Sequence, residues 1–248
     1  DAKNDSNSIG VGAFGPATGN VVTENDVQGA DGAKVTAVKF GDVTVAVPGT
    51  GSITINGAYG VLTLSADGSY SYQRNAGTPG GVSDAFTYTL TDGDTDTDTA
   101  VLTISIGNDV PTITNVPTAG GSGAVVNEAG LPARTGEPAG SNAAANSETT
   151  EGSFKYTGGD APAVLTINGT PVTGVAGQAI STDKGVLTIV SVVGGTVNYT
   201  YTLSDNTLGE GTSDALALLV TDADGQTASS TLTINIVDDA PDAKNDSN

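Results

Sequence analysis

The chain contains a long internal duplication. Residues Ser83–Pro111 (SDAFTYTLTDGDTDTDTAVLTISIGNDVP) align without a gap on Ser213–Pro241 (SDALALLVTDADGQTASSTLTINIVDDAP). Further upstream, SYSYQ in the first copy matches NYTYT in the second, and GVLTL matches GVLTI. A duplication on this scale predicts two related domains, which we place at residues 1–110 and 111–241.

A second repeat joins the two ends of the sequence. Asp1–Asn7 and Asp242–Asn248 are identical (DAKNDSN). We therefore expect the chain to be one period of a longer tandem array, with residues 242–248 as the start of the next repeat. The expected partners are neighbouring identical repeats in the same chain.

Apolar residues alternate with Thr, Ser or Asn in short bursts, the period expected of half-buried strands. The clearest bursts are SITIN (Ser52–Asn56), VLTLS (Val61–Ser65), AVLTISI (Ala100–Ile106), VLTIN (Val164–Asn168) and STLTINIV (Ser230–Val237). Turn signals such as ADGS, VGGT and DADG separate them. The pattern predicts an all-β protein made of two tandem antiparallel β-sandwich domains of the immunoglobulin-like kind.

Two segments do not follow the strand pattern. Residues 117–152 are rich in Ala, Gly, Pro and Asn, and only AVVN (Ala124–Asn127) resembles a strand. Two interpretations stay open: a long surface loop with a helical turn near Asn142–Asn146, or an ordered insert that covers a sheet edge. The first thirty residues look similarly irregular.

The residue types that are missing narrow the function. The chain has no His and no Cys, so the usual nucleophile–base pairs and soft-metal sites are unavailable. A hydrolase with paired carboxylates remains formally possible, but the acidic residues lie in turns and linkers. We therefore expect no enzyme. No run of 18 apolar residues is present, so we also expect no membrane insertion.

Charge gives the strongest functional signal. The chain has 8 basic and 28 acidic residues, a net charge of −20 and a pI near 4.1, which excludes nucleic acid as a natural partner. The carboxylates cluster at the domain junctions, in the penultimate hairpins and near the domain starts. These clusters contain the candidate metal ligands Asn108, Asp109, Asp238, Asp239 and Asp242; Asp92, Asp94, Asp222 and Asp224; and Asp26 and Glu128.

Calcium fits these clusters best, because it takes six to eight hard oxygen ligands in flexible geometry. In a sandwich the final strand, expected at Thr227–Val237, runs from one end of the domain to the other. The hairpin before it should point back toward the preceding junction. We therefore expect one calcium site shared by Asn108, Asp109, Glu128, Asp222 and Asp224.

Three stretches resemble a known family. They are Thr221–Pro241 (TDADGQTASSTLTINIVDDAP), Asn127–Pro132 (NEAGLP) and Gly19–Val38 (GNVVTENDVQGADGAKVTAV). They resemble the VCBS and cadherin-like extender repeats of large bacterial adhesins exported by type I secretion. The resemblance implies a cadherin-like fold, calcium at the domain junctions, an extracellular location on the bacterial surface, and a spacer that holds a terminal adhesive domain away from the cell during attachment and biofilm formation.

The sequence departs from that family in two places. The first domain has DGDTDTDT where the second has DADGQTAS, so the two hairpins need not bind alike. The segment 117–152 is not required of a minimal extender.

The calcium-binding nonapeptides (GGxGxDxUx) of RTX proteins do not occur in this sequence. We expect the isolated fragment to be monomeric.

The alternative is a module that itself binds a glycan or ice. Thr95, Thr97 and Thr99 form a short threonine row that could face ice. A glycan site would need an exposed aromatic platform, and the chain has no Trp. The Tyr pairs are spaced for packing along one face of a sheet, and threonine in strands usually reflects β-propensity alone.

Overall fold

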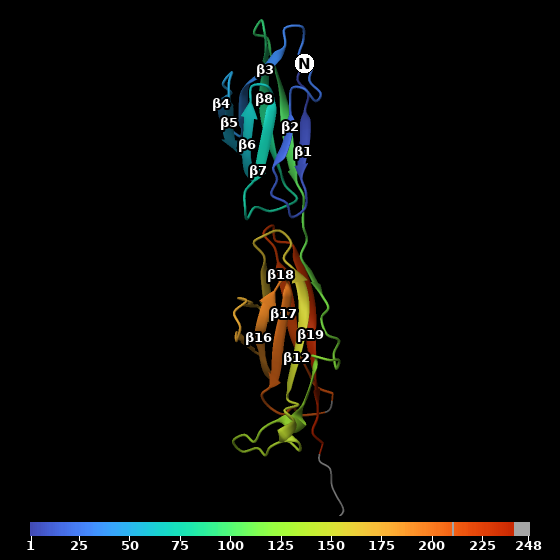
Figure 1. The fold of residues 1–248 in the computed structure, drawn as a ribbon. Helices are drawn as coiled ribbons and strands as arrows, with labels where there is room; N and C mark the ends of the chain where they lie inside the picture. Colours follow the sequence, from blue (N-terminus) through green and yellow to red (C-terminus); the bar gives the residue numbers. More distant parts are fainter. Residues whose placement is uncertain (210, 241–248) are drawn as a thin grey trace, which may run out of the picture. The chain divides into compact units, whose positions relative to one another are not determined.

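The computed structural model describes residues 1–209 and 211–240. The chain divides into two compact units (Figure 1). Unit 1 comprises Asp1–Asp109 with Gly159–Pro162, and unit 2 comprises Val110–Gly158 with Ala163–Asn248. The domain bounds 1–110 and 111–241 stay a prediction. Within the described ranges, no helix is both long enough and apolar enough to cross a membrane.

Unit 1 is a sandwich of two sheets. One sheet has the order β1 (Asp5–Ile9), β9 (Thr97–Ile106), β8 (Ser83–Asp92), β3 (Ala33–Phe40) and β4 (Val43–Ala46). The other has the order β2 (Ala17–Asn20), β7 (Ser69–Arg74), β6 (Gly60–Ser65) and β5 (Ser52–Asn56). The pairings are antiparallel except for β1, which lies parallel to β9.

Unit 2 repeats this plan with an extra edge strand. One sheet has the order β11 (Val125–Asn127), β19 (Thr227–Val237), β18 (Ser213–Thr221), β13 (Val164–Ile167) and β14 (Thr170–Pro171). The other has the order β10 (Thr112–Thr114), β12 (Thr149–Thr157), β17 (Thr196–Leu203), β16 (Gly185–Val193) and β15 (Ala179–Ser181). β11 is again parallel to the last strand. The prediction of tandem immunoglobulin-like sandwiches is confirmed.

Each unit has its own core, filled by the inward residues of both sheets. The alternation seen in the sequence carries through: β6 reads buried–intermediate along its whole length, and β18 alternates in the same way. Burying a large apolar side chain contributes roughly 1.5–3 kcal/mol, so these faces supply most of the folding free energy. The predicted packing of the tyrosine pairs is confirmed for Tyr70, Tyr72, Tyr199 and Tyr201.

The tyrosine rings fit because glycine lies opposite them. Tyr72 packs over Gly60 of the neighbouring strand, and Tyr201 packs over Gly185. A Cβ on Gly60 would lie 2.5 Å from the backbone oxygen of Gln73, a contact that no side-chain rotation can relieve. Glycine at these positions is therefore required by packing rather than by backbone conformation.

Each of these tyrosine hydroxyls donates a hydrogen bond to a buried aspartate. Tyr72 Oη donates to Asp84 Oδ2 at 2.6 Å, and Tyr201 Oη donates to Asp214 Oδ2 at 2.7 Å. Burial, followed by the hydrogen bond to the carboxylate, raises the pKa of both hydroxyls. A buried carboxylate is costly unless it is hydrogen-bonded. Each pair joins one sheet to the other and therefore favours one position of the two sheets relative to each other.

Sequence periodicity located the central strands but missed those at the start of the chain. Four of the five predicted bursts lie wholly in strands, and the fifth, Val164–Asn168, extends one residue beyond β13. The first thirty residues, expected to be irregular, contain β1 and β2. β1 (DSNSI) is too polar to show a period, and it is held by parallel backbone pairing with β9.

The segment 117–152 is ordered. It contains β11, the short 3-10 helices η1 (Glu128–Gly130) and η2 (Ala143–Ala145), and the start of β12. The predicted helical turn at Asn142–Asn146 is confirmed by η2, whose caps are those two residues. We call residues 128–148 the insert: they join β11 to β12, where unit 1 joins β1 to β2 through residues 10–16.

The glycine packing makes a stability prediction. Gly60→Ala should lower the free energy of unfolding of unit 1 by about 1–3 kcal/mol, because the new methyl collides with Tyr72 and with backbone. Gly49→Ala is the matched control, since a Cβ there meets nothing within 4 Å. Urea unfolding followed by tyrosine fluorescence measures both. Equal stability of the two variants would contradict the packing argument.

Candidate cation sites

The hairpin between β8 and β9 gathers three carboxylates in unit 1. Asp92, Asp94 and Asp96 each place an oxygen within 4.8 Å of the others. The Asp96 backbone N–H donates to Asp92 Oδ1 at 2.9 Å, which closes the turn. The hydrogen bond with Asp92, followed by repulsion between the two carboxylates, raises the pKa of Asp94. Hard oxygen ligands at this spacing suit a divalent cation.

Asp26 lies near the same end of unit 1, beside a buried carboxylate that the sequence analysis did not single out. Asp26 Oδ2 accepts from Tyr88 Oη at 3.0 Å, and Asp5 Oδ2 lies 2.9 Å from the same hydroxyl. The hydroxyl also lies 2.8 Å from the Lys3 carbonyl oxygen. The Tyr88 hydroxyl has one proton and cannot donate to all three oxygens at once. The carboxylates of Asp5 and Asp26 therefore share a single donor, and their negative charges lie close together.

The equivalent hairpin in unit 2 holds the most buried of the predicted hairpin ligands. Asp222 is 6% exposed, and its Oδ1 accepts from the backbone N–H of Gln226 at 2.7 Å. Its Oδ2 is buried and has no hydrogen-bond partner among the described residues. Contact with Asp222 raises the pKa of the exposed Asp224. Gln226 occupies the position of Asp96, so this hairpin has one carboxylate fewer than the hairpin of unit 1.

A second acidic cluster lies at the opposite end of unit 2. Asn127 caps η1 by accepting from the backbone N–H of Ala129, which places Glu128 at the first position of the turn. Glu128 is 4% exposed, and its Oε1 accepts from both the backbone N–H and the hydroxyl of Thr207, each at 2.6 Å. Glu128, Asp238 and Asp239 line a common cavity of about 300 Å³.

The insert contacts the end of the last strand directly. The backbone N–H of Ser141 donates to Asp239 Oδ2 at 2.6 Å, and its hydroxyl donates to Oδ1. These bonds lower the pKa of Asp239, because they favour its charged form. The insert therefore lies over the end of unit 2.

The expected grouping of Glu128 with Asp222 and Asp224 is wrong. Asp222 follows Thr221, which pairs with Thr227 at the start of β19, whereas Glu128 follows Asn127, which pairs with Val237 at its end. A strand of this length separates the two clusters by roughly 30 Å, so one ion cannot contact both. The error arose because the direction of β11 was not evident from sequence.

The remaining predicted ligands are placed as follows. Asn108 and Asp109 are half-buried and follow β9, at the end of unit 1 opposite the Asp92 hairpin. Asp242 lies outside the described residues. Asp96 could have been found from its spacing in DGDTD. Asp5 could not, because its burial depends on the pairing of β1.

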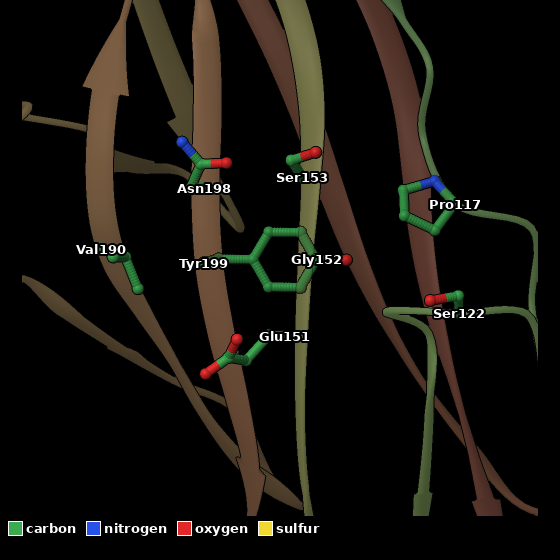
Figure 2. Close-up of a pocket in the computed structure, with 8 residues that line it drawn as sticks. All are labelled: Pro117, Ser122, Glu151, Gly152, Ser153, Val190, Asn198 and Tyr199. Atoms are coloured by element: carbon green, nitrogen blue, oxygen red, sulfur yellow. The ribbon is translucent and has the colours of Figure 1, made fainter.

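A different hollow of about 440 Å³ lies on unit 2 (Figure 2). Its lining residues come from the β10–β11 connection and from β12, β16 and β17: Pro117, Ser122, Glu151, Gly152, Ser153, Val190, Asn198 and Tyr199. Tyr199 is 1% exposed, and its hydroxyl donates to the Gly123 carbonyl at 2.8 Å. Its ring belongs to the core and offers no stacking surface for a sugar.

The threonine row is similarly limited. Thr97 and Thr99 lie on β9 opposite Thr91 and Thr89 of β8, whereas Thr95 lies in the hairpin turn with a φ of 80°. The row predicted from Thr95, Thr97 and Thr99 is thus interrupted at its first member, because a turn residue does not continue the face of a strand.

Comparison with known proteins agrees with the architecture. Residues 2–105 match the family described as bacterial Ig domain. No curated protein matches the sequence. The chain is similar in structure to protocadherin gammaB7 EC3-6, with 11% identity and a TM-score of 0.31, covering 96% of this chain and 46% of that one. It is also similar to mouse PcdhgC3 EC1-3, with 16% identity and a TM-score of 0.28, covering 94% and 64%.

The tandem Ig repeats of Dlar are a third similar structure, with 14% identity and a TM-score of 0.24, covering 96% of this chain and 94% of that one. The chain spans about half the length of the gammaB7 protocadherin structure. Likenesses this distant carry no argument about function. The fold and the family match together show immunoglobulin-like domains in tandem, with residues 2–105 matching the bacterial Ig type.

The buried Asp5 makes a pH prediction. Burial, together with Asp26 and Glu24, raises its pKa from 3.8 to about 6. The folded protein therefore takes up a proton that the unfolded chain does not between about pH 6 and pH 4, so this group adds stability as the pH falls. In chelator, Asp5→Asn should have a higher melting temperature than the wild type at pH 7.5. Near pH 4 the two melting temperatures should be equal.

Asp67→Asn is the control of opposite sign. The Ser69 hydroxyl and then its backbone N–H lower the pKa of Asp67, so its stabilisation is present at neutral pH and is lost in acid. Asp67→Asn should therefore melt below wild type at pH 7.5. A constant difference between Asp5→Asn and wild type from pH 7.5 to 4 would refute the raised pKa.

Proposed function

We propose that the chain is a calcium-stabilised extender repeat of a long bacterial surface adhesin. In this role it binds no receptor itself. It projects a terminal adhesive domain from the cell for attachment and biofilm formation, and neighbouring repeats of the same chain are its partners. Type I secretion and an extracellular location follow from the family that the sequence resembles, and calcium at the domain junctions is its proposed cofactor.

The observation that supports calcium most is the carboxylate of Asp222. It is 6% exposed, one of its oxygens has no hydrogen-bond partner among the described residues, and Asp224 lies against it. A buried carboxylate without compensation is costly, and a second one beside it adds repulsion. A cation held by these oxygens removes both costs. Calcium fits the donor set, which consists of carboxylate, amide and backbone oxygens.

The clusters at the two ends of unit 2 favour a spacer over an enzyme. Hard oxygen ligands lie at both ends of unit 2, around Asp222 and around Glu128. A repeat whose cation ligands lie at its ends is suited to being joined end to end. The residues that line the hollow of Figure 2 include no exposed aromatic side chain and no pair of carboxylates. The hollow therefore supports neither a glycan-binding site nor a glycoside hydrolase.

Calcium should raise the melting temperature. An ion that binds only the folded chain contributes RT ln(1 + [L]/Kd), about 2.7 kcal/mol at a hundredfold excess over Kd. We expect a rise of several degrees in calcium over chelator, and a smaller rise in magnesium, which demands tighter octahedral geometry. Calorimetry with and without each ion measures the shift.

Asp222→Asn tests the residue that carries the argument. It should stabilise the chelated protein, because it removes a buried charge whose Oδ2 has no hydrogen-bond partner among the described residues, and it should reduce the calcium-dependent rise. Asp42→Asn, a change to an exposed carboxylate in the β3–β4 turn, is the control and should leave that rise intact. Identical melting curves of the wild type in calcium and in chelator would contradict the proposal.

The spacer role also predicts a rigid chain. Each domain should be roughly 35–45 Å long if its strands run about ten residues. We expect small-angle scattering in calcium to give a maximum dimension near the sum of two domain lengths. The chelated protein and the Asp109→Ala, Asp222→Ala double variant should give a broader distance distribution. A compact or equally flexible calcium-loaded chain would favour the ligand-binding alternative.

A further inference from the structure

The chain has two arginines, and Arg134 lies in the insert at the acidic end of unit 2. Its backbone pairs with that of Glu137: the N–H of Arg134 donates to Glu137 O at 3.1 Å, and the N–H of Glu137 donates to Arg134 O at 3.0 Å. The Arg134 side chain is 22% exposed. The small hairpin thus carries a partly buried cation.

The guanidinium joins the insert to the loop that follows β17. Its Nε donates to Glu137 Oε2 at 3.2 Å, and its Nη2 donates to the same oxygen. Nη2 also lies 3.1 Å from Asp205 Oδ1 and 3.2 Å from Asn206 Oδ1. Asp205 is well exposed, so that ion pair taken alone contributes little. The arrangement matters as a network of one cation with several acceptors from two segments.

The same end of unit 2 is otherwise acidic. Arg134 lines the cavity of about 300 Å³ together with Glu128, Glu137, Asp238 and Asp239, and among the described residues it is the one cationic member of that lining. Its Nη1 is buried and has no hydrogen-bond partner among the described residues. A positive charge inside a ring of carboxylates lowers their mutual repulsion, and it also repels any metal ion that approaches them.

We propose that Arg134 is an internal cation that holds the insert on the acidic end of unit 2 without calcium, and that it lowers the calcium affinity of that end. The second half rests on the proposed function, and the first half does not. Arg134 acts here as a positioning residue: it keeps Ser141 in reach of Asp239 and keeps η1, with Glu128, over the cavity. The hairpin of Asp222 has neutral Gln226 at its third position, so the two ends of unit 2 differ in their need for an ion.

Hydrogen exchange of the full chain tests this with Arg134→Gln and the charge-retaining control Arg134→Lys. The reporters are the backbone amides of Glu137, Gly140 and Asn142, whose hydrogen bonds close the insert. In chelator, Arg134→Gln should exchange at these amides at least about tenfold faster than wild type, and Arg134→Lys should stay close to wild type. Calcium chloride should restore the protection in Arg134→Gln, because the ion replaces the lost charge.

Two outcomes overturn the proposal. One is unchanged protection in Arg134→Gln in chelator. The other is a loss that neither lysine nor calcium reverses, since that would mean that the shape of arginine matters and its charge does not. The Gln226 amide of the wild type reports separately on the proposed function. If calcium protects neither that amide nor the insert of Arg134→Gln, the proposed function fails, and the lysine variant in chelator alone decides whether Arg134 holds the insert by charge.

Discussion

The closure of two sheets over an apolar core keeps unpaired charge out of the interior of each unit. Inward positions of the strands are taken by large apolar side chains such as Phe86 and Leu216, which are fully buried. A carboxylate can enter that layer only with dedicated donors, as Asp84 does with Tyr72 and two backbone N–H groups. The turns at the ends of the strands are where many of the remaining carboxylates gather.

The two units share one sheet topology, apart from the extra edge strand of unit 2, but differ in the residues at the ends of their strands. Ile9 pairs with Ile106 as Val126 pairs with Ile236, so the register places Val11 of unit 1 where unit 2 has Glu128. Val11 is exposed, whereas Glu128, the first residue of the insert, is buried. The duplicated core thus tolerates large changes between its first strands, because those connections lie outside the packed layers.

The proposed spacer depends on this separation of core and ends. A core held by tyrosine over glycine and by the Tyr–Asp pairs keeps its register without any ion. The ends can therefore carry carboxylates that are only partly hydrogen-bonded, such as Asp222. One end of unit 2 also carries its own cation, Arg134. Ion dependence is then a property of particular ends and not of the whole domain.

Much of the fold could be predicted from the sequence, because strand alternation and turn residues are local signals. The duplication, the central strands, the tyrosine packing and the acidic hairpin at Asp222 were all evident. The candidate sites were predicted only as lists of acidic residues. Which of those residues meet depends on strand direction: the parallel pairing of β11 with β19 sends Glu128 to the end opposite Asp222.

Burial was equally beyond the reach of the sequence. Asp5 is polar, lies in a polar stretch and gives no periodic signal, yet pairing with β9 places it beneath Tyr88. Arg134 lies in a segment without a strand pattern, and only the tertiary structure brings that segment against Asp239, just after β19. The sequence by itself determined the type of each domain and the oxygen chemistry of its candidate ligands. Only the tertiary structure decided their grouping, because contacts between residues distant in the chain are set by strand pairing, which leaves no local pattern.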